Sequence, residues 1–321
     1  MGINLDKPQN WKADTSQSVD MYNDWFKKFA PDAFRATRVQ TAKDVEATLH
    51  ATDNLTNVQI AVLRKHPNIL PTLRMSTCPP LAVDRLVGLA GVPKSMVERM
   101  EKENELPVRM NKTQIDQELE KIGSIIERMA DPDIFVWLNR DEDEPPTETE
   151  IQRAATIVAD RLCGSIANPI IRNTQEKRQL AAIRSWLKDR GYRQIQSGDG
   201  ITFDNMSPGT FSFRMNVPVY LENGKSVNIP IDAVIMPKKA KAEDFPIFFE
   251  AKSAGDFTNV NKRRKEEAIK MTQLRNTYGD KINFNLFLCG YFNSGYLGYE
   301  AAEGIDWVWE HRIDDLAGFG L

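Results

Sequence analysis

The segment Val227-Asn-Ile-Pro-Ile-Asp232 is followed, after an insert, by Phe248-Phe-Glu-Ala-Lys252. Both segments are apolar and indicate β-strands, yet each carries charged side chains. Seventeen residues separate Asp232 from Glu250. Glu250 and Lys252 are two residues apart, so their side chains point to the same face of a strand. If the two strands pair, one edge of the sheet presents two carboxylates and one ammonium group.

These charges favour catalysis at a metal ion. Charged groups inside an apolar strand are costly unless they are paired or bound to a metal. The carboxylates of Asp232 and Glu250 repel each other, and a hard cation such as Mg²⁺, which prefers oxygen ligands, removes that repulsion. A metal there activates water and screens phosphate charge, while Lys252 orients or deprotonates the water or stabilises the phosphorane. The alternative is an internal salt bridge between Asp232 and Lys252. We favour phosphodiester hydrolysis because strand-like sequence surrounds both carboxylates.

Glu176 is a third candidate acid, near the start of a helix expected from Thr174 to about Arg190. Glu176 could hold a second metal through water or orient Lys252. However, Asn173-x-x-Glu176 also resembles a capping box, which requires no metal. The two interpretations carry equal weight.

The second half of the chain has an α/β pattern. After the helix that ends at Gly191, strands are expected over 210–221, 226–236, 246–252 and 283–291, with a helix over 260–278 between the last two. The first half is mostly helical, with expected helices near 16–29, 41–50 and 111–129. A further helix, from Glu148 to about Cys163, is expected to lead into the second half.

The domain boundary is expected in an acidic stretch with two prolines, residues 140–147. We therefore predict a helical domain over 1–145 and a catalytic domain over 146–321. The first 150 residues have 19 basic and 25 acidic side chains, whereas residues 151–321 have 23 and 20. The second half thus better tolerates an anionic partner.

Composition excludes several classes of protein. No apolar run approaches the roughly 20 residues of a membrane-spanning helix, and the first residues lack the apolar core of a signal peptide. Cys78, Cys163 and Cys289 lack CxxC spacing, which argues against a disulfide framework or a cysteine-based zinc ribbon. We expect a cytoplasmic protein with no membrane partner.

Two resemblances extend this interpretation. Pro230-Ile-Asp232, with one inserted residue, and Glu250-Ala-Lys252 resemble the PD-(D/E)xK nuclease superfamily. Most of residues 16–310 resembles the XamI-type family of type II restriction endonucleases. The stretches that carry this second resemblance are Asn54-Leu-Thr-Asn57, Thr72-Leu-Arg-Met-Ser-Thr-Cys-Pro-Pro80, Asp84-Arg-Leu-Val-Gly-Leu-Ala-Gly-Val92, Glu250-Ala-Lys-Ser-Ala-Gly-Asp-Phe257 and Asn261-Lys-Arg-Arg-Lys-Glu-Glu267.

The resemblance implies an α+β or α/β fold, in which a helical N-terminal region precedes a restriction-endonuclease-like core with a mixed sheet flanked by helices. It implies that a homodimer cleaves double-stranded DNA at a short palindrome in an Mg²⁺-dependent reaction. The palindrome is GTCGAC for the family's namesake. A cognate methyltransferase would act on the same site without binding this chain. By the superfamily pattern, Asp232 and Glu250 bind metal, Ala251 contributes its carbonyl and Lys252 is catalytic.

Two alternative functions remain open. One is a structure-specific DNA repair or junction nuclease with the same core. The other is a non-catalytic DNA-binding regulator, which is weakened because Asp232, Glu250 and Lys252 are all present.

A basic cluster follows the second strand and is a candidate for DNA contact: Asn259, Asn261, Lys262, Arg263, Arg264 and Lys265. Arginine pairs with guanine and asparagine with adenine in the major groove, and lysine or arginine also binds phosphate. The alternative is a solvated helix start, which Glu266 and Glu267 support.

A second candidate for DNA contact is residues 81–99, where two helices around Ala90-Gly-Val92 resemble a helix-turn-helix. Lys94, Ser95 and Arg99 would then face the groove. The alternative, an αα-hairpin within a helical domain, is the commoner arrangement.

Overall fold

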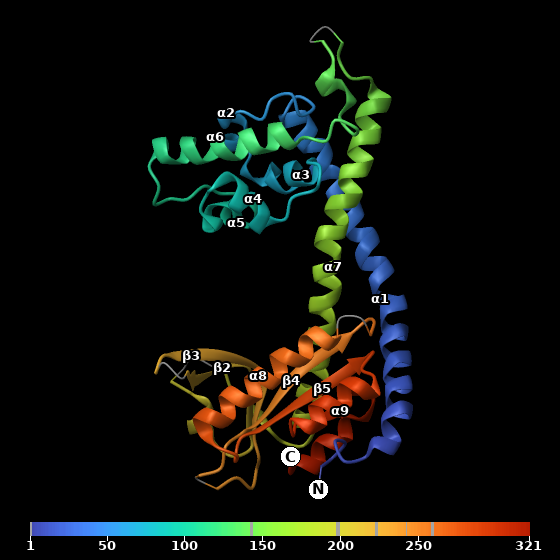
Figure 1. Ribbon diagram of the computed structural model, residues 1–321, viewed down its shortest axis with the longest axis vertical. Coiled ribbons are helices and arrows are strands. Elements are labelled where there is room, and N and C mark those ends of the chain that lie inside the picture. Colours follow the sequence, from blue (N-terminus) through green and yellow to red (C-terminus); the bar gives the residue numbers. More distant parts are fainter. Residues whose placement is uncertain (1, 142–143, 197–199, 222–223, 242, 258–259) are drawn as a thin grey trace. The chain divides into compact units, whose positions relative to one another are not determined.

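The computed structural model describes residues 2–321 except 142–143, 197–199, 222–223, 242 and 258–259, and it describes only the backbone of 260–264. The chain divides into two compact units, drawn in Figure 1. Unit 1 comprises Met1–Phe29 and Arg172–Leu321, and unit 2 comprises Ala30–Ile171. No helix among the described residues is long and apolar enough to cross a membrane.

Two long helices each contribute to both units: α1 (Pro8–Ala51) and α7 (Glu148–Asp189). We had expected two shorter helices in place of each, and that prediction was wrong. Each helix continues through an internal proline, Pro31 or Pro169, although proline removes a backbone hydrogen bond. The apolar pattern changes along each helix because its two ends pack into different cores, and this change resembles a break in the sequence.

The same packing explains why the observed division differs from the expected boundary at residue 145. Ala154 and Val158 of α7 belong to the core of unit 2. Trp11 of α1 belongs to the core of unit 1. The boundaries between the units therefore fall within the two long helices, near their prolines, rather than in the acidic stretch.

Unit 2 is helical, as expected from the sequence. Between the ends of α1 and α7 it contains α2 (Ile60–Lys65), η1 (Pro67–Ile69), α3 (Leu70–Met75), α4 (Val83–Ala90), α5 (Lys94–Glu103), α6 (Lys112–Met129) and η2 (Val136–Asn139). A capping box formed by Asn111 and Gln114 starts α6. Leu63, Met96, Ile122 and Phe135 are fully buried in a shared core.

Unit 1 is built on a six-stranded sheet in the order β1-β2-β3-β4-β5-β6. The strands are β1 (Arg193–Gln194), β2 (Thr210–Tyr220), β3 (Ser226–Met236), β4 (Ile247–Ala254), β5 (Asn283–Gly290) and β6 (Asp306–Trp309). The β2–β3 and β3–β4 pairs are antiparallel and the other pairs are parallel. The sheet is therefore mixed, which confirms the expected fold class.

Helices cover both faces of this sheet (Figure 1). Leu180 and Ile183 of α7 pack on the face that carries Phe249 and Phe287. The opposite face, which carries Phe248 and Leu286, packs against α8 (Val260–Tyr278) and α9 (Ser294–Ala302). Two 3₁₀ segments, η3 (Phe203–Asn205) and η4 (Glu310–Phe319), complete unit 1. Glu250 and Lys252 have the same strand parity as Phe248, so they face α8.

The apolar side chains of strands β2 and β3 switch from one face of the sheet to the other at a single position. On one side of it, Phe211 of β2 and Ile235 of β3 pack in the cluster against α7. On the other side, Met215 and Ile231 pack in the cluster on the opposite face. The register aligns Phe213 with Ala233 and Met215 with Ile231. The exchange therefore falls at the intervening pair, Arg214 and Asp232, and Arg214 has a left-handed backbone with φ of 53°.

Candidate active site

Asp232 and Glu250 meet where strands β3 and β4 separate. The last aligned pair of the antiparallel ladder is Ala233 with Phe249. Beyond it, the backbone N–H of Ala251 donates to Asp232 Oδ2 at 2.9 Å. A side-chain carboxylate thus takes a main-chain hydrogen bond next to the second acid.

Two lysines and one further carboxylate surround Glu250. Its Oε1 lies 3.2 Å from Lys252 Nζ and 2.5 Å from Lys270 Nζ. Lys252 Nζ also lies 3.0 Å from Glu267 Oε1. Glu267 and Lys270 are one helical turn apart on α8, which places both side chains above the same strand. The sequence prediction assigned neither residue to the site. The only signal in the sequence is their i, i+3 spacing, and their contact with the strand depends on the tertiary structure.

Burial and neighbouring charges shift the pKa values of this cluster. Burial, with repulsion from Glu250, raises the pKa of Asp232 from 3.8 to about 6, although the Ala251 N–H opposes the change. Burial alone would lower the pKa of Lys252, but the carboxylates of Glu250 and Glu267 outweigh it and raise this pKa. The pKa of Glu267 is also raised by burial, while Lys252 opposes that effect. The acidic and basic side chains of the cluster therefore interact in an environment of low dielectric constant.

This donor set fits a hard divalent cation. Glu250 Oε2 is buried and forms no hydrogen bond with any described residue. Repulsion between Asp232 and Glu250 is relieved when a cation lies between them. Within the described part of the chain, no three His, Cys, Asp or Glu side chains are grouped closely enough to hold a metal. The fit therefore rests on two carboxylates plus main-chain oxygen, such as the Ala251 carbonyl.

Glu176 lies in the interior of α7, so the expected helix start at Asn173 does not exist and the capping-box interpretation was wrong. Its Oε1 lies 2.6 Å from Arg214 Nη2. Glu176 is also close enough to Asp232 to raise the pKa of that carboxyl. The ion pairs of Lys252 are with Glu250 and Glu267, so Glu176 does not orient Lys252 by direct contact.

Arg214 is a residue that the sequence prediction missed altogether. A left-handed arginine costs about 1–2 kcal/mol, because its Cβ crowds the following carbonyl and glycine avoids that clash. The pair with Glu176 is exposed, at 59% for the Arg214 side chain and 35% for Glu176. Exposed pairs contribute only about 0–1 kcal/mol. The ion pair therefore does not compensate for the backbone strain.

The basic cluster after β4 is only partly described. Asn259 lies outside the described residues, as do the side chains of Asn261, Lys262, Arg263 and Arg264. The backbone of α8 begins at Val260, as expected, and Lys265 is exposed on it. The assignment of these residues to DNA contact stays a prediction.

Residues 81–99 form the expected pair of helices, α4 and α5, in unit 2. Gly91 ends α4 with φ of 65°, a left-handed conformation suited to glycine. Ser95 is exposed. Lys94 Nζ lies 2.8 Å from Asp84, and Arg99 pairs with Glu103 and Glu105. Both cations therefore already have acidic partners close by in the same unit.

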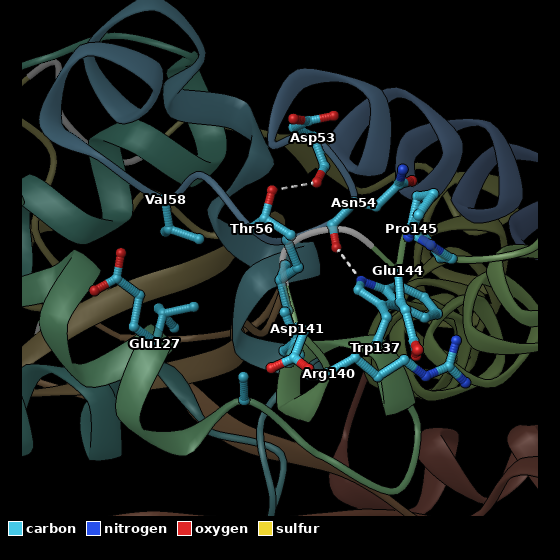
Figure 2. Close-up of a pocket in the computed structure, with 15 residues that line it drawn as sticks. Asp53, Asn54, Thr56, Val58, Glu127, Trp137, Arg140, Asp141, Glu144 and Pro145 are labelled. Atoms are coloured by element: carbon cyan, nitrogen blue, oxygen red, sulfur yellow. Dashed lines mark hydrogen bonds between the residues drawn. The ribbon is translucent and has the colours of Figure 1, made fainter.

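Unit 2 contains a pocket of about 650 Å³, and none of the candidate site residues lines it (Figure 2). Asp53, Glu127, Asp141 and Glu144 are among the residues that line it. Trp137 Nε1 donates to the Asn54 carbonyl at 2.9 Å beside it. These four acidic side chains outnumber Arg140, which also lines the pocket, and they repel the polyanionic backbone of DNA. We therefore assign no DNA contact to this pocket.

Replacing Asp232 by asparagine is expected to stabilise the metal-free protein near pH 8. The folded pKa of about 6 exceeds the ordinary value of 3.8, so the folded state binds the proton more tightly than the unfolded state. The parent protein therefore loses folding stability as the pH rises from 3.8 to about 6. Because Asp232 is partly exposed, the loss is on the order of 2 kcal/mol.

Thermal unfolding at about pH 5 and about pH 8 tests this expectation. The asparagine variant should gain about twice as much stability over the parent at pH 8 as at pH 5, because pH 5 lies within the interval between 3.8 and about 6 in which the stability is lost. Asp280→Asn, at an exposed position after α8, is the control. An equal gain at both pH values would contradict the assignment.

Comparison with known proteins identifies the family of this chain. The family model described as XamI restriction endonuclease matches residues 53–309. The type II restriction enzyme SalI of Streptomyces albus G is 52% identical over 318 residues, which cover 99% of both chains. A crystal structure of protein VC1899 from Vibrio cholerae aligns with 80% of this chain and 55% of its own at 12% identity, but its TM-score of 0.27 is too low to support any argument. On the family match and the full-length relative, this chain belongs to the XamI restriction endonuclease family.

Proposed function

We propose that this restriction endonuclease hydrolyses both strands of DNA at a short palindromic site, using the group formed by Asp232, Glu250 and Lys252. The observation that carries the proposal is the buried approach of two carboxylates and a lysine at the point where β3 and β4 separate. The alternative salt bridge between Asp232 and Lys252 is less well supported, because the ion pairs of Lys252 are with two glutamates.

Asp232, Glu250 and the Ala251 carbonyl are the proposed ligands of a divalent metal, and Mg²⁺ is the cation that best suits oxygen donors beside phosphate. A metal bound there supplies Lewis acidity and a more acidic water. Lys252 stays protonated beside its two glutamates, so we assign it to orient the attacking water and to stabilise charge on the phosphate. Glu267 holds Lys252 in position, and Lys270 neutralises Glu250 in the absence of metal.

DNA contact is proposed for Lys265 and for its neighbours Asn259, Asn261, Lys262, Arg263 and Arg264, which come shortly after the catalytic strand. Contact through Lys94, Ser95 and Arg99 is a weaker proposal, because the two cations are already paired with acids. A cognate methyltransferase would protect the same DNA site in the cytoplasm of the cell without binding this chain.

A plasmid digest tests the proposed function. Incubation with Mg²⁺ should give discrete fragments, and chelation of the metal should stop the reaction. Cutting at branched or distorted DNA alone would favour the repair or junction nuclease, and binding without cutting would favour the regulator. A parallel digest with SalI would show whether this chain shares the recognition site of its relative, because shared sites give identical fragments.

A homodimer is expected on the cognate duplex. A palindrome presents two equivalent half-sites, and a two-fold dimer places one catalytic group on each strand. Sizing of the protein with and without a cognate oligonucleotide measures this. One chain per duplex, together with simultaneous cleavage of both strands, would contradict the expectation.

A further inference from the structure

We propose that Arg214 binds a phosphate of the DNA strand held at Asp232, and that Glu176 holds the guanidinium in place until DNA arrives. The inference rests on the proposed active site. It adds to that site a residue that contacts DNA and a partner that positions it.

The strand register places Arg214 beside the active site. The pairs Phe213–Ala233 and Met215–Ile231 flank it, so Arg214 lies opposite Asp232 in the antiparallel ladder. The left-handed backbone of Arg214 interrupts the regular pairing at this position, but the aligned pairs on both sides keep Arg214 and Asp232 next to each other. The Arg214 side chain is 59% exposed and its guanidinium lies beside Glu176, whose carboxylate is itself close to Asp232. A strand of DNA that reaches Asp232 therefore comes within range of Arg214.

The left-handed backbone of Arg214 favours a functional role for its side chain. At φ of 53°, in a strand whose neighbours change faces, glycine would allow the same backbone with less strain. The exposed ion pair with Glu176 stabilises the folded protein by less than the backbone strain destabilises it. Strained residues of this kind gather where a side chain must be presented to a ligand.

The chemistry of the pair favours phosphate as that ligand. A guanidinium offers a planar fork of donors that matches two phosphate oxygens as well as it matches a carboxylate. Glu176 thus occupies the place that a phosphate takes in the complex. When DNA displaces Glu176, Arg214 contributes positive charge next to Asp232 and Glu250, where two carboxylates would otherwise repel the incoming phosphate.

Three variants test the inference. Arg214→Gly removes the guanidinium and keeps the left-handed backbone, Arg214→Lys keeps a charge without the fork, and Glu176→Gln weakens the hold on Arg214. The control is Arg35→Ala, which removes an exposed arginine paired with Asp32 in unit 2. Each protein is measured for melting temperature, for single-turnover cleavage of a cognate duplex with Mg²⁺, and for metal-free binding to that duplex across a salt series.

Arg214→Gly should melt at or above the parent temperature, yet cleave at least about tenfold more slowly, and its plot of log affinity against log salt should be shallower by about one for each chain bound. Arg214→Lys should recover part of the binding and the salt slope but not the full rate. Glu176→Gln should bind metal-free DNA as tightly as the parent or more tightly. Arg35→Ala should match the parent throughout.

The inference is overturned if Arg214→Gly keeps the parent rate and salt slope, or if its loss of rate only follows a loss of folded protein. Asp232→Ala is run in parallel to test the active site itself. Cleavage by that variant at the parent rate would remove the proposed site, whereas an inactive Asp232→Ala beside a fully active Arg214→Gly would remove the role of Arg214 alone.

Discussion

Asp232→Ala is expected to abolish cleavage while the protein stays folded and binds DNA at least as tightly as the parent in the absence of metal. The variant loses one proposed metal ligand, and the loss of about 4 kcal/mol of transition-state stabilisation slows the reaction about a thousandfold. Without metal, the ionised carboxylate repels the phosphate, so its removal takes away an unfavourable interaction. Glu250→Ala should behave in the same way.

The measurements are Mg²⁺-dependent cleavage, metal-free affinity for a cognate duplex, and melting temperature. Asp280→Ala, which removes an exposed carboxylate from the same unit, is the matched control and should cleave as the parent does. Full cleavage by a folded Asp232→Ala or Glu250→Ala protein would rule out the site. Loss of DNA binding along with cleavage would mean that the carboxylates act through the fold.

Lys252→Met is expected to be inactive for a different reason, and a second substitution separates that reason from stability. The single variant leaves the fully buried Glu267 without its lysine, and breaking a buried pair costs about 3 kcal/mol. Lys252→Met combined with Glu267→Gln removes both charges and should recover most of the lost stability. Glu250 keeps Lys270 as a partner in both proteins.

The double variant decides between a catalytic and a structural lysine. If Lys252 serves catalysis, the double variant melts near the parent temperature and still does not cleave. If Lys252 only stabilises the fold, activity returns together with the melting temperature. Glu267→Gln alone should keep partial activity, because Lys252 then has Glu250 as its remaining partner. Metal-free DNA binding should weaken in both lysine variants, since each loses a positive charge beside the phosphate.

Local sequence was sufficient to predict the catalytic strands. The strands expected over 210–221, 226–236 and 283–291 match β2, β3 and β5 to within a residue at each end. The strand expected over 246–252 is β4, which ends two residues later than expected. The helix expected over 260–278 coincides with α8. Apolar runs of strand length are properties of neighbouring residues, so the chain displays them without its tertiary contacts.

Local sequence did not predict that α1 and α7 are each one continuous helix. A helix that packs into two different cores changes its apolar face along its length, and Pro31 and Pro169 strengthen the impression of a break. The division of the chain between the two units was hidden for the same reason, because it depends on which core each half of these helices contacts.

The sequence by itself determined which two strands carry Asp232, Glu250 and Lys252, and it placed Glu250 and Lys252 on one face because strand parity follows from spacing. Only the tertiary structure decided what surrounds them. Glu267 and Lys270 reach the group because α8 packs on that face of the sheet. Arg214 lies opposite Asp232 because of strand register and a left-handed backbone, and neither is encoded in local spacing. Burial then raises the pKa of Asp232, because desolvation depends on the whole of the surrounding fold.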